Sequence, residues 1–158
     1  QFPEKLIPLM IVNSIQEKDM LIYGKGNQIR DWIYVEDHVD AICEILKSGK
    51  IGEIYNIGGE SKLTNINVVK KISTLLDKKK PRKNNKSYLS LLKYVKDRPA
   101  HDKRYSVNIS KIRKEVKWKP KINFNYGIEK TVDWYLANET WWKLILKNSY
   151  SGERLGKL

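Results

Sequence analysis

The chain has 158 residues, 41% of them apolar, which suits one folded domain with its own core. Its formal net charge is +13, from 31 Lys and Arg against 18 Asp and Glu. It has no run of about 18 apolar residues, so no membrane-spanning helix is predicted. The single cysteine, Cys43, excludes an internal disulfide, and we expect a cytoplasmic protein.

The first residues show no secretory signal pattern. Gln1 is not an initiator residue and an amphipathic segment begins almost at once, so we expect the chain to continue upstream. Three strands and two helices are predicted in the first part of the chain: a helix over residues 1–18, a strand over 20–23 that Gly24 stops, a strand over 29–34, a helix over 35–47 and a strand over 53–57.

Cys43 shares a helical stripe with Val39, Ile42 and Leu46, so we interpret it as a small buried side chain. Thr64 is predicted to cap a helix that runs to about Asp77. Further on, residues 88–95 are helical at first and strand-like later. Four more segments are predicted after them: a strand over 105–107, a small helix capped by Asn108 or Ser110, and helices over 126–138 and 140–147. Alternating helices and strands predict an α/β or α+β class.

The positive charge suggests nucleic acid at first sight. Lysine outnumbers arginine 25 to 6, however, which resembles general compositional drift. The densest basic run, residues 78–86, has no aromatic side chain on which a base could stack. We interpret this run as a solvated loop. A basic nucleic-acid-binding module remains as an alternative.

Arg30 lies at the start of a predicted strand, directly after the turn formed by residues 24–27. A guanidinium held there can bind a phosphate or carboxylate through two parallel hydrogen bonds. A surface ion pair with Asp31, Glu36 or Asp37 explains the same residue equally well. The residues alone leave both interpretations open.

A second arginine, Arg98, lies beside His101, and Asn65 lies at the start of a predicted helix. Two arginines and a helix N-terminus can together hold a pyrophosphate. The simpler alternative, slightly favoured by the residues alone, is a surface salt-bridge network of Asp97, Arg98, Asp102 and Arg104.

The sequence offers little support for other chemistry. His38 and His101 are expected to be structural hydrogen-bonding residues, and no His or Cys spacing indicates a metal site. Neither G-x-x-G-x-x-G nor G-x-G-x-x-G occurs, so the residues predict no nicotinamide cofactor site. The pair Tyr126 and Lys130 has the Y-x-x-x-K spacing of short-chain dehydrogenases, which we interpret as coincidence.

The segments QFPEKLIPLMI, QIRDWIYVEDHVDAI, GEIYNIGGES and YVKDRPAHDKRY together closely resemble the dTDP-glucose 4,6-dehydratases. These are extended short-chain dehydrogenases/reductases that act on nucleotide sugars. The resemblance covers nearly the whole chain in order. It implies an α/β enzyme of two lobes, in which an amino-side Rossmann lobe holds NAD and most catalytic groups.

On this resemblance, residues 1–147 are the carboxyl-side lobe that binds the nucleotide sugar, and residues 148–158 are a tail. The implied enzyme is a homodimeric hydro-lyase. It converts dTDP-glucose to dTDP-4-keto-6-deoxyglucose and water, for rhamnose and other deoxysugars, and it needs neither nucleic acid nor membrane. The cofactor lobe is missing here, so we expect this chain alone to be inactive. The alternative within enzymes is the equivalent lobe of another nucleotide-sugar epimerase or dehydratase.

The resemblance also implies roles for individual residues. Arg30 and Arg98 match arginines on the diphosphate, and residues 21–23 match a strand that contacts the thymidine. Residues 97–101 match a loop that closes over the nucleotide. The full set of implied substrate-binding residues is Lys5, Leu21, Ile22, Tyr23, Arg30, Asn65, Asp97, Arg98 and His101, with no catalytic, cofactor-binding or metal-binding residue among them.

The sequence departs from the family in two further places. Ala100 stands where the family usually has glycine, which is a mild change unless that position needs a positive φ. The chain also ends in SGERLGKL, shorter than the usual tail, so a contact from the tail to the substrate is not expected.

Overall fold

The computed structural model describes residues 3–148. The chain folds into two compact units, each assembled from separate stretches of sequence. Among the described residues, the first unit comprises residues 3–27, 65–101 and 129–148, and the second comprises residues 28–64 and 102–128. None of the helices described is long and apolar enough to cross a membrane.

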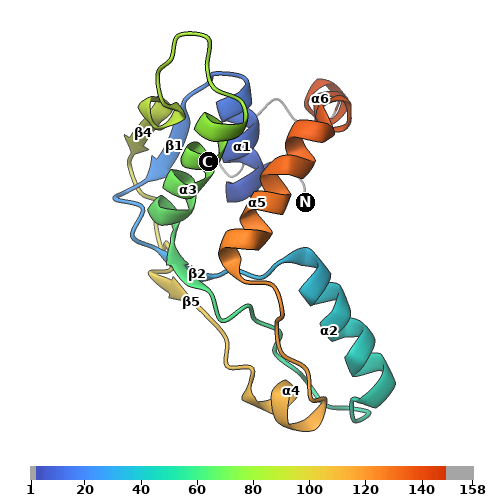
Figure 1. The fold of residues 1–158 in the computed structure, drawn as a ribbon. Coiled ribbons are helices and arrows are strands. Elements are labelled where there is room, and N and C mark those ends of the chain that lie inside the picture. Colours follow the sequence, from blue (N-terminus) through green and yellow to red (C-terminus); the bar gives the residue numbers. More distant parts are fainter. Residues whose placement is uncertain (1–2, 149–158) are drawn as a thin grey trace. The chain divides into compact units, whose positions relative to one another are not determined.

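The first unit is organised around two helices and a pair of parallel strands (Figure 1). Helix α1 (Leu6–Ile15) packs on α3 (Asn65–Lys79), and β1 (Met20–Tyr23) pairs with β4 (Leu92–Val95). Pro8 lies in the first turn of α1, where its missing N–H costs no hydrogen bond. The buried apolar side chains of these elements include Met10, Ile11, Val12, Met20, Ile22, Ile66, Val68, Val69, Ile72, Leu75 and Leu76.

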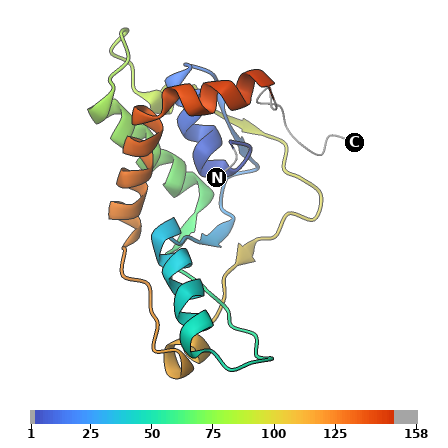
Figure 2. The same ribbon diagram turned by 90° about the vertical axis from the view of Figure 1, so that its right-hand side faces the viewer.

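Two further helices complete this unit. Helix α5 (Phe124–Ala137) begins in the second unit and is followed, after one residue, by α6 (Glu139–Asn148) (Figure 2). Trp142 is fully buried, and its indole Nε1 donates to the Tyr135 carbonyl at 3.0 Å. Burial raises the pKa of the Tyr135 hydroxyl to about 12. On the surface, Lys79 of α3 forms ion pairs with Glu129 and Asp133 of α5.

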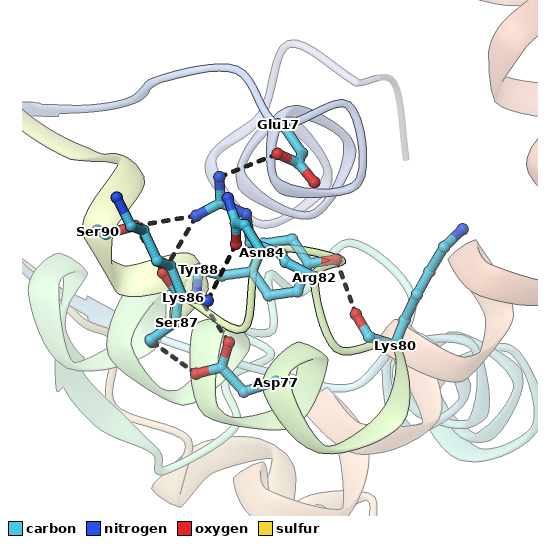
Figure 3. A network of polar contacts seen from close by, with 9 residues as sticks. All are labelled: Glu17, Asp77, Lys80, Arg82, Asn84, Lys86, Ser87, Tyr88 and Ser90. Atoms are coloured by element: carbon cyan, nitrogen blue, oxygen red, sulfur yellow. Dashed lines mark hydrogen bonds and ion pairs between the residues drawn. The ribbon is translucent and has the colours of Figure 1, made fainter.

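The basic run of residues 78–86 is anchored by one buried arginine (Figure 3). The Arg82 side chain is only 7% exposed, and it bonds to Glu17 Oε2 and Ser90 Oγ, both at 2.9 Å. Its guanidinium also lies over the Tyr88 ring, 5.8 Å from the centroid. The prediction of a solvated loop is therefore wrong for Arg82, although the five lysines around it are not buried.

Across the base of the same loop, Asp77 fixes the start of the 3-10 helix η1 (Tyr88–Leu91). Its carboxylate accepts from the Ser87 hydroxyl at 2.6 Å and from the Tyr88 N–H at 2.7 Å (Figure 3). Helix η1 then leads directly into β4, which confirms the predicted change from helix to strand within residues 88–95.

The second unit contains a small sheet and two helices. Strand β2 (Ile29–Asp31) lies between β3 (Lys62–Thr64), antiparallel to it, and β5 (Arg104–Tyr105), parallel to it. Outside the sheet, α2 (Val35–Ser48) packs on α4 (Ser110–Glu115). The core residues of this unit are Ala41, Ile109, Ile112, Val116 and Trp118.

A buried carboxylate ties α2 to the chain that leads into α5. Asp37 is 3% exposed and accepts hydrogen bonds from the backbone N–H groups of Lys121 and Ile122 at 2.8–3.1 Å. Asp37 therefore has a structural role inside the protein, in addition to its favourable place in the first turn of the helix.

The interpretation of Cys43 as a buried side chain is wrong. Cys43 is exposed, and Val39, Ile42 and Leu46 on the same stripe are 53%, 43% and 82% exposed. Helix α2 instead directs Ala41 and Asp37 toward the rest of the unit. Helical spacing identifies an apolar face but does not say whether this chain supplies the surface that covers it.

The predicted strand over residues 53–57 does not form either. This segment has no strand partner among the described residues, and a strand needs a neighbour for its backbone N–H and C=O groups. Elsewhere the structure shortens predicted elements: the strand over 29–34 ends at Asp31, and the first helix covers only Leu6–Ile15. Strand β3 was not predicted from the sequence.

Candidate functional site

The carboxyl ends of β1 and β4 bring two of the predicted segments together. These strands are parallel, with Tyr23 opposite Val95, and the Gly24 N–H donates to the Val95 carbonyl at 2.9 Å. The residues that follow each strand therefore leave the sheet at the same edge. The turn of residues 24–27 follows β1, and the loop of residues 97–101 follows β4.

Arg98 and His101 from this loop both contact the aromatic ring of Tyr23. The Arg98 guanidinium carbon lies over the ring, 5.7 Å from its centroid, within the range of a cation–π interaction. The His101 ring approaches edge-on, at a centroid distance of 6.5 Å and an interplanar angle of 82°. The side chains of Tyr23, Arg98 and His101 thus form one cluster, although about 75 residues separate Tyr23 from the other two.

The Asp97 carboxylate bonds to the ring of His101 and to the backbone of Arg98. Its Oδ1 atom lies 2.6 Å from His101 Nδ1 and accepts from the Arg98 backbone N–H at 2.8 Å. No ion pair within the described residues of the first unit involves the Arg98 guanidinium, and none in the second unit joins Asp102 to Arg104. The salt-bridge network considered as the alternative does not form within either unit.

The turn of residues 24–27 also reaches the start of α3. Its Gly26 carbonyl accepts from the Ile66 N–H at 3.0 Å, one residue after Asn65, which begins the helix as predicted. A Cβ at Gly26 would lie 2.8 Å from Ile22 and 3.0 Å from Ile66, so only glycine fits there, at φ +70°. The same turn therefore borders both the loop of residues 97–101 and the N-terminal end of α3.

The other residues of the first unit that were predicted to bind the substrate differ in their exposure to solvent. Leu21 is 40% exposed, whereas Ile22 is buried, so Ile22 can meet a ligand only through its backbone. Lys5 precedes the first residue of α1, and its amine forms an ion pair with Glu4 at 2.6 Å. Lys5 is thus exposed and paired with the carboxylate of its neighbour.

Arg30 belongs to the second unit, in the centre of the three-stranded sheet. Its guanidinium donates to the carbonyls of Ile29 at 2.8 Å and Asp102 at 3.0 Å. The ion pair with Asp31, Glu36 or Asp37 that served as the alternative does not form among the described residues. The convergence of Arg30 and Arg98 on one diphosphate stays a prediction.

The backbone of the loop is unusual at Ala100, where the sequence pointed to strain only if the position needs a positive φ. Ala100 has φ +51°, a left-handed conformation that L-residues other than Asn and Asp seldom adopt. The resemblance stated above, which implies glycine at this position, was the available signal. The change to alanine is therefore strained and not mild.

Two further kinds of site, a structural histidine and a metal centre, were also considered in the sequence. His38 is exposed, and its side chain makes no hydrogen bond in the described residues, so the prediction of a structural role holds for His101 and not for His38. No group of three His, Cys, Asp or Glu in the described part of the chain could hold a metal ion. The sequence GKGNQI at residues 24–29 lacks the third glycine of a dinucleotide-binding signature, so these residues do not fit NAD.

Comparison with known proteins supports the family resemblance found in the sequence. The model of the GDP-mannose 4,6 dehydratase family matches residues 1–131. A probable dTDP-glucose 4,6-dehydratase of Sinorhizobium fredii is 50% identical over 157 residues, which are 99% of this chain and 44% of that protein. The chain thus spans less than half the length of this relative.

Two solved structures agree in fold. The dTDP-glucose 4,6-dehydratase of Bacillus anthracis in complex with NAD has a TM-score of 0.79 at 44% identity, over 92% of this chain and 43% of that one. The enzyme of Streptomyces venezuelae with NAD and TYD bound has a TM-score of 0.82 at 36% identity, over 92% and 42%. The resemblance to dTDP-glucose 4,6-dehydratases and the α/β class are confirmed, and the chain belongs to the GDP-mannose 4,6 dehydratase family.

Proposed function

We propose that residues 1–147 are the nucleotide-sugar-binding, carboxyl-side lobe of a dTDP-glucose 4,6-dehydratase, followed by a tail from residue 148. The observation that carries this proposal is the cluster of Tyr23, Arg98 and His101 at the shared edge of β1 and β4. The carboxyl ends of parallel strands are a common place for ligands in α/β proteins. Arg98 is exposed there, and no ion pair occupies its guanidinium among the described residues, so its donors can bind an anion.

Arg98 and Tyr23 of the cluster, with residues near them in the sequence or implied by the resemblance, suit different parts of a nucleoside diphosphate. Arg98 would bind the diphosphate, together with Arg30 of the second unit and the N-terminal end of α3 at Asn65. The exposed Leu21 and the ring of Tyr23 offer apolar surface for the base. Lys5 would add a further positive charge near the start of α1.

The longer protein would be a homodimeric, cytoplasmic enzyme that converts dTDP-glucose to dTDP-4-keto-6-deoxyglucose and water, in the synthesis of rhamnose and other deoxysugars. NAD supplies the hydride acceptor for such a reaction, and it would be bound by the amino-side Rossmann lobe. The residues of this chain would bind and orient the nucleotide sugar. Because they include no dinucleotide signature, this chain alone would not turn over substrate.

Calorimetric titration of dTDP and of thymidine into the 158-residue chain tests the proposal. Substitution Arg98→Ala or Arg30→Ala removes a charged hydrogen-bond donor, so dTDP binding should weaken by about 1.5–3 kcal/mol, or roughly 10- to 150-fold. Thymidine has no diphosphate, and its binding should change little. Arg113→Ala is the matched control, since Arg113 is half exposed and pairs with Glu60 on the surface.

Two results would favour the alternatives. Binding of UDP-glucose more tightly than dTDP-glucose would indicate the equivalent lobe of an epimerase or another dehydratase. The absence of dTDP binding, combined with salt-dependent binding of duplex DNA, would indicate a basic nucleic-acid-binding module.

A further inference from the structure

Strand β2 carries Arg30 on the face of the three-stranded sheet that looks away from the core of the second unit. Successive side chains of a strand point to opposite faces, so Asp31 lies on the other face. A Cβ at Gly58 would lie 2.7 Å from Asp31 Oδ2 and 3.2 Å from the side chain of Ile109, which belongs to that core. The face of Asp31 is therefore the inner one, and the face of Arg30 is the outer one.

Tyr105 of β5 shares the outer face with Arg30. The two residues are directly paired across the parallel strands β2 and β5, so their side chains point to the same side of the sheet. Neighbouring strands lie about 4.8 Å apart, which places the two side chains next to each other. Tyr105 is 64% exposed, and its hydroxyl makes no hydrogen bond with the described residues.

The guanidinium of Arg30 is held close to the segment that leads into β5. Its Nη1 atom donates to the Asp102 carbonyl at 3.0 Å and to the Ile29 carbonyl at 2.8 Å. The Nε and Nη2 atoms make no hydrogen bond with the described residues, so they can bind an anion through two parallel hydrogen bonds. An anion bound in this way would lie beside the ring of Tyr105.

We propose that Tyr105 is a specificity-determining residue, which contacts the hexose of the nucleotide sugar next to the diphosphate at Arg30. This inference rests on the proposed nucleotide-binding function and adds a residue to that site. In a nucleotide sugar, the diphosphate has the nucleoside on one side and the hexose on the other. Tyr23 and Leu21 of the first unit are assigned to the nucleoside, so the part of the ligand that remains for Tyr105 is the hexose.

The chemistry of a tyrosine side chain suits a hexose, because it combines an apolar ring with one hydroxyl group. The ring can pack on the C–H groups of the pyranose, and the hydroxyl can share a hydrogen bond with a sugar hydroxyl. The Tyr105 hydroxyl would break no existing bond to a described residue when it does so. Because dTDP has no hexose, Tyr105 should affect the binding of dTDP-glucose and not that of dTDP.

Calorimetric titration of dTDP and of dTDP-glucose into the 158-residue chain separates this contact from the rest of the site. Tyr105→Ala should weaken binding of dTDP-glucose about tenfold, and Tyr105→Phe about threefold, since the phenylalanine loses only the hydrogen bond. Binding of dTDP should change by less than about twofold in both variants, which also shows that the site is still folded. Tyr126→Ala is the matched control, because Tyr126 is 52% exposed in the same unit.

Saturation-transfer NMR of bound dTDP-glucose shows which part of the ligand lies next to the ring. Transfer from the aromatic protons of the protein to the hexose protons should fall in Tyr105→Ala, whereas transfer to the thymine methyl group should stay the same. A decrease at the thymine methyl group alone would place Tyr105 at the base and overturn the proposal.

The titrations also distinguish failure of the hexose contact from failure of the nucleotide site. If Tyr105→Ala weakens dTDP and dTDP-glucose equally, or changes neither, the hexose contact is wrong and the nucleotide site stands. If the unsubstituted chain does not bind dTDP, the proposed function is wrong, and the hexose contact that rests on it is wrong as well.

Discussion

Replacement of Arg82 by methionine should destabilise the first unit by about 3 kcal/mol. Ser90 Oγ at 2.9 Å and the Ser87 carbonyl at 3.4 Å would lose a charged donor, which costs about 1.5 kcal/mol for the shorter bond and less for the longer one. The cation–π contact with Tyr88 adds about 1 kcal/mol. The ion pair with Glu17 adds about 0.5 kcal/mol, since the Glu17 side chain is 46% exposed.

Thermal unfolding followed by circular dichroism measures this effect. For a chain of this length, about 3 kcal/mol corresponds to a fall in Tm of roughly 6–12 °C. Lys83→Met is the matched control, because Lys83 is the exposed neighbour and its substitution should change stability by less than about 0.5 kcal/mol. An Arg82→Met variant that melts at the same temperature as Lys83→Met would refute the view that Arg82 anchors the loop (Figure 3).

Three other predictions concern stability and association. Ala100→Gly should raise the free energy of unfolding by about 0.5 kcal/mol, because relief of the left-handed strain at Ala100 slightly exceeds the cost of the added flexibility of glycine in the unfolded chain. Urea titration measures this free energy, and a lower value for the variant would contradict the presence of strain at Ala100. Burial holds the pKa of Tyr135 at about 12, so the unfolded chain, in which tyrosine ionises near pH 10, binds fewer protons above that pH. The free energy of unfolding should therefore fall by up to about 2–3 kcal/mol between pH 10 and 12, and Tyr135→Phe should remove that part of the decrease. The exposed apolar face of α2 should promote self-association of the chain. The double substitution Val39→Lys and Leu46→Lys should reduce the associated fraction measured by sedimentation velocity. An unchanged fraction would show that this face does not cause the association.

Helix α2 illustrates what the sequence could and could not predict. Acidic residues at its start and Gly49 after its end located both termini within a residue. The same spacing suggested that the stripe of Val39 and Leu46 was buried, but these residues are exposed. Local periodicity depends on one helix, whereas burial depends on which other segments pack against it.

For the predicted site, too, the sequence showed the chemistry of the residues but not how they come together. The chemistry of Arg98 and His101 was visible in the sequence, and so was the aromatic residue at the end of β1. Their meeting at Tyr23 depends on the parallel pairing of β1 with β4, which neither segment encodes alone. Gly24 and Ala100 gained their significance only from backbone conformation. Arg82 was missed because a buried arginine in a basic run looks like its solvated neighbours.

The proposed function depends most on a diphosphate that is shared by Arg30 and Arg98. A crystal structure of the chain with dTDP bound tests this directly. We expect guanidinium nitrogens of both residues to lie about 2.7–2.9 Å from phosphate oxygens of the same ligand. A bound dTDP whose diphosphate contacts only one of the two arginines, or neither, would contradict the proposed nucleotide-sugar site.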